Sequence, residues 1–156
     1  MQVKNIGTEM AVRKIMHYAA YQERSHSEVK KKLYSFGLYK HEVELLIAKL
    51  IEDDYLNEER FAIAFAGGKF RIRQWGKVKI KYELKQKGVS NYCIQKALAS
   101  IDEKSYMATL NKLYVQKLKT IVGDKGSYLS KAKLLAYLTQ KGYETKQVYE
   151  IIKASK

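Results

Sequence analysis

The densest group of charged side chains in this sequence is cationic and lies in the middle of the chain. Residues 61–100 contain nine basic residues and one acidic residue, Glu83, which gives a net charge of +8. Self-repulsion in such a stretch costs stability unless a partner of opposite charge offsets it. The sequence therefore predicts contact with a polyanion, either a nucleic acid or an acidic protein. A lysine-rich surface that is merely solvated is the alternative.

Basic residues alternate with aromatic and aliphatic residues at the centre of this stretch. Such interleaving suits a phosphate backbone with exposed bases, and it suits an acidic protein groove equally well. Phe70 and Trp75 are candidates for stacking; in the alternative, both rings pack in the core while the basic groups stay in water. The predicted contact residues are Lys69, Arg71, Arg73, Lys77, Lys81 and Lys85, with Lys30 and Lys31 as a second cluster.

The residues that could support catalysis or hold a metal lack the spacing that such chemistry needs. The three histidines have no metal-ligand spacing, and Cys93 beside an apolar stripe is predicted to be an inert buried thiol. Gly67-Gly68-Lys69 lacks the upstream glycine and the following Ser or Thr of a phosphate-binding loop. Glu52-Asp53-Asp54 is predicted to form an exposed turn. We therefore expect a protein that is not an enzyme and that uses no cofactor or metal.

A repeated leucine and glycine pattern predicts the helices that position the cations. The segments 25–38, 76–89 and 130–143 align on one glycine each. In every segment a leucine precedes the glycine by four residues, and a Val, Ile or Leu precedes it by eight, so both lie on one helix face. The glycines, which fit left-handed C-caps, are Gly37, Gly88 and Gly142.

The start of each of these helices also has a predicted cap. Ser25 and Ser130 occupy N-cap positions, and Ser25 forms a capping box with Glu28. Gly76 takes the same place in the second segment. On the helix that follows Gly76, the lysines at 77, 81 and 85 recur every four residues and predict a continuous basic stripe.

Two further predicted helices flank each glycine-anchored helix, one before it (about 9–23, 57–73 and 103–121) and one after it. The absence of proline favours helices joined by short turns. The predicted fold is all-α, an elongated array of three tandem three-helix repeats. The predicted domains are 1–55, 56–101 and 102–156. A single compact nine-helix globule is the alternative.

The same residues carry a resemblance to a known family. The matching residues are Arg24, Ser25, Glu28, Leu33 and Gly37; the run 54–62, DYLNEERFA; and Gly76, Ile80, Glu83-Leu84, Lys87-Gly88-Val89 and Ala97-Leu98. This combination resembles the regulatory protein RecX family over about residues 24–101. One departure is Gly67-Gly68, where we expect long polar residues.

The resemblance implies three tandem three-helix units and a non-enzymatic role. It implies binding to the filament that the RecA recombinase forms on single-stranded DNA, with double-stranded DNA as a second ligand. It further implies reduced ATP hydrolysis, strand exchange and coprotease activity, and hence restraint of recombinational repair and of the SOS response. A general basic DNA-binding module and a scaffold for an acidic protein are the alternatives.

Composition also indicates a location. One cysteine, no apolar run near 20 residues and no N-terminal signal-peptide pattern indicate a soluble cytoplasmic protein without membrane contact. We expect a monomer.

Overall fold

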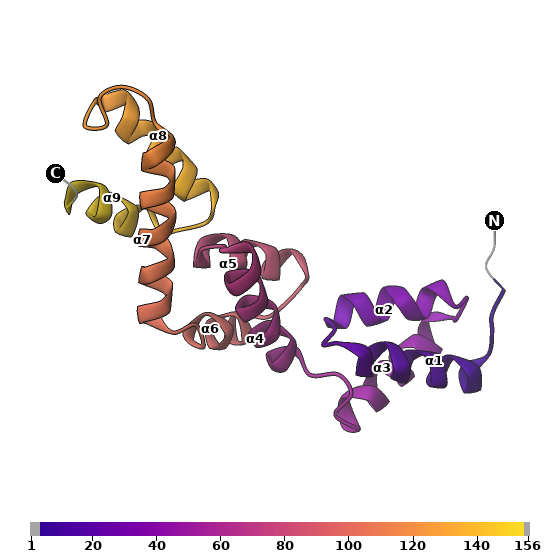
Figure 1. The fold of residues 1–156 in the computed structure, drawn as a ribbon. Helices are drawn as coiled ribbons and strands as arrows, with labels where there is room; N and C mark the ends of the chain where they lie inside the picture. The colour runs from indigo at the N-terminus through magenta and orange to yellow at the C-terminus, as the bar shows by residue number, and fades with distance from the viewer. Residues whose placement is uncertain (1–3, 155–156) are drawn as a thin grey trace. The chain divides into compact units, whose positions relative to one another are not determined.

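The computed structural model describes residues 4–154, and within this range every regular element is helical (Figure 1). The predicted all-α fold is therefore confirmed. The helices are α1 (Thr8–Tyr21), α2 (His26–Ser35), α3 (Lys40–Glu52), α4 (Glu58–Gly68), the π-helix η1 (Lys69–Arg73), α5 (Lys77–Gln86), α6 (Asn91–Ala99), α7 (Glu103–Thr120), α8 (Tyr128–Gln140) and α9 (Thr145–Ala154).

The chain divides into two compact units. Unit 1 comprises Met1–Ala64 with Leu84–Lys96, and unit 2 comprises Phe65–Glu83 with Ala97–Lys156. Helices α1, α2 and α3 pack together in unit 1, and α7, α8 and α9 pack together in unit 2. The division into three repeats at 1–55, 56–101 and 102–156, and their elongated arrangement, stay predictions.

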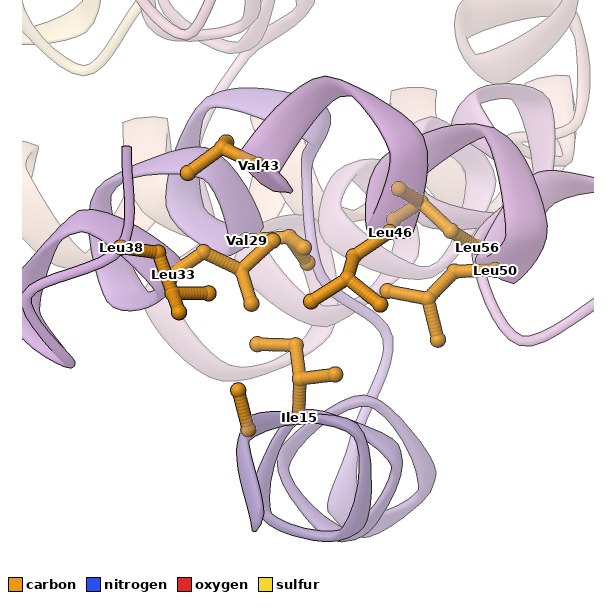
Figure 2. Close-up of a cluster of buried hydrophobic side chains, with 9 residues drawn as sticks. Ile15, Val29, Leu33, Leu38, Val43, Leu46, Leu50 and Leu56 are labelled. Atoms are coloured by element: carbon orange, nitrogen blue, oxygen red, sulfur yellow. The ribbon is translucent and has the colours of Figure 1, made fainter. Parts of the chain in front are cut away.

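The core of each unit is built from the predicted inward stripes. In unit 1, Val29 and Leu33 of α2 are fully buried, and Ile15 points toward them from α1 (Figure 2). In unit 2, Leu134 and Leu138 of α8 are 1% and 0% exposed. Helix α5 follows the same pattern, because Ile80 and Leu84 are both fully buried. The spacing of four and eight residues before each glycine therefore predicted the core correctly.

Two of the three predicted caps on these helices are found at their predicted places. Ser25 caps α2 and forms a capping box with Glu28, while Gly76 immediately precedes α5. The prediction for Ser130 was wrong. Helix α8 begins a turn earlier, and Ser127 accepts a hydrogen bond from the Ser130 amide. The Ser130 hydroxyl is buried instead and donates to the Asp124 carbonyl, which ties down the preceding loop.

All three repeat glycines adopt the predicted left-handed conformation, with φ of 81° at Gly37, 77° at Gly88 and 104° at Gly142. The carbonyl just before each of them accepts a hydrogen bond from another part of the chain. Phe36 accepts from the Ile6 amide, Lys87 from the Ser27 hydroxyl, and Lys141 from the Gly76 amide. The glycine turn is therefore a recurring acceptor site.

The contact between Gly76 and Lys141 is one of two hydrogen bonds that join these backbone segments directly. The Val78 amide donates to the Gly142 carbonyl at 2.9 Å, beside the Gly76–Lys141 bond. A Cβ at Gly76 would lie 2.3 Å from the Gly142 carbonyl carbon, and a Cβ at Gly142 would lie 2.3 Å from Lys79 Cβ. Since real Cβ atoms do not approach so closely, both positions require glycine.

Tyrosines complete the junction where the N-terminus of α5 meets the α8–α9 turn. Tyr106 of α7 accepts from the Lys77 amide and donates to the Glu144 carboxylate. The Tyr143 hydroxyl donates to the Gln74 carbonyl at 3.0 Å. Burial raises the pKa of both phenols above the ordinary value, and Glu144 raises it further, through its hydrogen bond with Tyr106 and through its negative charge near Tyr143. Both are neutral donors in the folded protein.

The glycine contact predicts a contrast between two substitutions. Gly76→Ala lies at a negative φ and should destabilise the protein by at least about 2 kcal/mol, because the methyl group overlaps a backbone. Gly88→Ala is the matched control. It keeps open space around its Cβ and should cost only about 1 kcal/mol, for its left-handed φ. Urea unfolding followed by circular dichroism measures both; equal losses would contradict the contact.

The buried phenols predict a loss of stability in alkali. A phenol whose pKa is raised on folding contributes stability that is fully present below pH 10 and is lost as the pH rises above it. Tyr143→Phe should lower the free energy of unfolding at pH 8 by about 1 kcal/mol, since one hydrogen bond is lost. The variant should then lose stability less steeply than the wild type between pH 10 and 11.5. Parallel urea midpoints across that range would refute the assignment.

Candidate interaction surface

The most basic part of unit 2 begins where α4 widens into the π-helix η1. The predicted helix 57–73 is present, but its last five residues form the wider π turn, in which the Gln74 amide donates to the carbonyl of Lys69, five residues earlier. The segment ends at Gln74, a residue other than glycine in the left-handed region with φ of 58°. This geometry turns Phe70 inward and leaves the next three residues, Arg71, Ile72 and Arg73, exposed. We call these three residues the η1 tip.

Two side chains from the α8–α9 turn hold the end of η1. Lys141 Nζ donates to the Arg73 carbonyl at 3.1 Å, and the Tyr143 hydroxyl donates to the Gln74 carbonyl. A chain that leaves a helix through a left-handed residue exposes its last carbonyls, and these two bonds satisfy those of Arg73 and Gln74. The η1 tip is therefore fixed by the same turn that receives the N-terminus of α5.

The two arginines of the tip are not neutralised by ion pairs. Neither forms an ion pair with any carboxylate of the described residues. The Arg71 guanidinium lies over Gly67, with Nη1 2.7 Å from the point where a Cβ would stand. Gly67 thus makes room for the guanidinium, whereas a Cβ at Gly68 would meet open space. Ile72 is 81% exposed between the two charges.

The two candidate aromatic residues lie in different environments. Phe70 is 8% exposed and packs against Tyr106, with ring centroids 5.7 Å apart. Trp75 is half-buried, and its ring meets Phe65 edge-on. The ammonium groups of Lys69 and Lys79 lie 5.1 and 4.7 Å from the Trp75 centroid. The structure places Phe70 in the core and engages Trp75 in cation–π contacts.

The other predicted cations are not equivalent. Lys77 Nζ lies 3.3 Å from Glu103 Oε2 and 4.7 Å from the Tyr106 centroid, so much of its charge is offset within the protein. Lys81 is half-buried. Unit 2 brings together Lys69, Arg71, Arg73, Lys77 and Lys81, whereas Lys30, Lys31 and Lys85 belong to unit 1 and are exposed.

Three side chains of this surface were not among the sequence candidates. Ile72 could not be told from a core residue by its type, since isoleucine is usually buried. Lys79 of α5 contacts Trp75, which lies in the short connection before that helix, so helical spacing did not indicate the contact. Lys141 acts across 68 residues, so no local pattern could reveal it.

Other kinds of site find little support in residues 4–154. No cluster of three or more His, Cys, Asp or Glu side chains there is arranged to hold a metal ion. Within the same range, no helix combines the length and the apolar character needed to cross a membrane. Cys93 is a buried free thiol, as predicted.

A family model and the curated relatives that match this chain carry the same family name. The family model described as RecX, second three-helix domain, matches residues 57–98. The Regulatory protein RecX of Halalkalibacterium halodurans is 31% identical over 153 residues, which cover 96% of this chain and 57% of that protein. That of Clostridium acetobutylicum is 29% identical over 83% of this chain and 61% of that protein, so this chain spans about three-fifths of the length of these two relatives. That of Prosthecochloris aestuarii is 26% identical over 93% of both chains.

Solved structures share the fold. The crystal structure of RecX from Lactobacillus salivarius superposes with a TM-score of 0.84 over 94% of this chain and 95% of that one, at 24% identity. A second RecX crystal structure gives a TM-score of 0.83 over 95% of this chain and 72% of that one. The family model, the curated relatives and the common all-α fold therefore agree that this chain is similar to proteins of the RecX family over most of its length.

Proposed function

We propose that this protein is a regulator of the RecA recombinase that binds the recombinase filament on single-stranded DNA. Binding lowers ATP hydrolysis, strand exchange and coprotease activity, and thereby restrains recombinational repair and the SOS response. The relatives named Regulatory protein RecX support the regulatory role. The protein acts by binding rather than by catalysis, as a monomer in the cytoplasm, and double-stranded DNA is a second ligand.

The observation that carries the proposal is the pair of unneutralised arginines on the anchored η1 tip. Guanidinium groups present a rigid fork of donors that matches both phosphate and carboxylate. A nucleoprotein filament offers both anions, phosphate on its DNA and carboxylates on its protein. Because Lys141 and Tyr143 already fix the backbone of the tip, little conformational entropy is lost when it binds.

The surrounding cations add a field of the same sign. Phe65–Glu83 contains six basic residues and one acidic residue, Glu83. Of these cations, Lys77 is paired with Glu103, and Lys69 and Lys79 lie on the Trp75 ring. The field steers the protein toward a polyanion, and the two arginines supply the directed contacts. Lys30, Lys31, Lys81 and Lys85 act as further, weaker contacts.

The test is ATP hydrolysis by the cognate recombinase on single-stranded DNA, titrated with this protein at two salt concentrations. Inhibition should occur well below one copy per recombinase monomer. The double variant Arg71→Gln/Arg73→Gln should need about tenfold more protein, equivalent to about 1.4 kcal/mol, because two charge-assisted contacts are lost. The double variant Lys104→Gln/Lys112→Gln, which removes the same charge from exposed positions on α7, should inhibit as the wild type does.

Binding of the protein to single-stranded DNA with and without recombinase, measured beside ATP hydrolysis, separates the alternative functions. Equal affinity for DNA with and without recombinase, together with a steep salt dependence, would identify a general DNA-binding module instead. No DNA affinity and no effect on ATP hydrolysis would leave a scaffold for another acidic protein. Equal loss of inhibition in both double variants would show that inhibition depends on the total positive charge of the protein and not on the η1 tip.

A further inference from the structure

The η1 tip presents an aliphatic side chain where a purely electrostatic surface would present a polar one. Ile72 is 81% exposed and stands between Arg71 and Arg73, which are also exposed. An isolated exposed isoleucine is unremarkable on most surfaces. Here, however, it lies in a segment that the protein holds in an uncommon conformation.

Holding the tip in this form costs free energy. The π-helix is a rare element, and Gln74 adopts a left-handed φ of 58° that residues other than glycine avoid. Lys141 and Tyr143 donate hydrogen bonds to the two carbonyls that follow Ile72, those of Arg73 and Gln74. Backbone strain that neighbouring groups maintain is concentrated at functional sites. The conformation keeps Ile72 and both arginines outward.

The chemistry of the tip favours a protein partner over nucleic acid. Single-stranded DNA is bound through aromatic rings on which its bases stack. Phe70 is buried against Tyr106, and the ring of Trp75 is engaged by Phe65, Lys69 and Lys79. The apolar group left at the tip is aliphatic. An aliphatic side chain flanked by guanidinium groups matches an apolar protein pocket bordered by carboxylates.

We infer that the η1 tip recognises protein, by inserting Ile72 into an apolar pocket whose acidic rim pairs with Arg71 and Arg73. This inference rests on the proposed function, and it assigns the tip to the recombinase subunits of the filament rather than to their DNA. Burying an isoleucine stabilises a complex enough that truncation to alanine should weaken it about tenfold or more.

The test compares Ile72→Ala with the wild type in two binding assays on the full chain. One uses preformed recombinase filaments, and the other uses the same single-stranded DNA without recombinase, each at two salt concentrations. Ile72→Ala should weaken filament binding about tenfold and leave DNA binding unchanged. Its salt dependence should match that of the wild type, since no charge is removed.

Two further variants keep the result interpretable. Ile72→Leu should retain filament binding, because it conserves the apolar volume. Val122→Ala is the matched control, an aliphatic truncation at a position of unit 2 that is 97% exposed, and it should bind as the wild type does. Thermal unfolding should be unchanged in all three variants, since both positions lie in solvent.

The possible failures are distinct from one another. Equal weakening of both assays by Ile72→Ala would assign the tip to DNA and overturn the inference. Unchanged binding in both assays would also overturn it, while leaving the proposed function intact. A wild-type protein that neither binds filaments nor alters ATP hydrolysis would overturn the proposed function and, with it, the assignment of the tip to the recombinase.

Discussion

The close contact between Gly76 and Gly142 is the constraint on which unit 2 depends. Three consecutive amides at the start of α5 donate to Lys141, Tyr106 and Gly142, so the helix is capped by another part of the protein instead of by its own side chain. Three of the four amides that a helix N-terminus leaves without an intrahelical partner are thus used within the protein and are not available to an external anion. The basic surface must therefore bind through side chains, and the same contact decides where η1, directly before α5, can stand.

A single structural device recurs with different chemistry. The carbonyl before each repeat glycine accepts a hydrogen bond, but the donor is an amide for Phe36 and Lys141 and a serine hydroxyl for Lys87. The packing differs accordingly. The backbone of Lys4 and Asn5 closely approaches Gly37, whereas Gly88 has open space around it. Glycine is needed at Gly88 for its φ alone, and at Gly37 and Gly142 for its φ and its missing side chain.

These differences explain which features of the fold could be predicted from the sequence and which could not. Burial of Leu33, Leu84 and Leu138 follows from spacing, because helical periodicity is local. The π turn could not be predicted, since it changes the hydrogen-bond register of the helix by only one residue. Pairing of Lys77 with Glu103 joins residues 26 apart, and only the tertiary fold brings them together. The sequence therefore revealed the cationic stretch, but it did not reveal which of the charges are offset by neighbouring groups.

Some of the positive charges are partly neutralised within the protein, and this limits how they can bind a partner. Carboxylates and aromatic rings hold Lys77, Lys69 and Lys79 close to the protein, so these groups contribute mainly to a diffuse field. Such a field raises the rate of encounter with any polyanion and weakens as salt increases. It cannot distinguish a protein carboxylate from a DNA phosphate. Discrimination needs a group that one partner can bury and the other cannot, and on this surface Ile72 is that group.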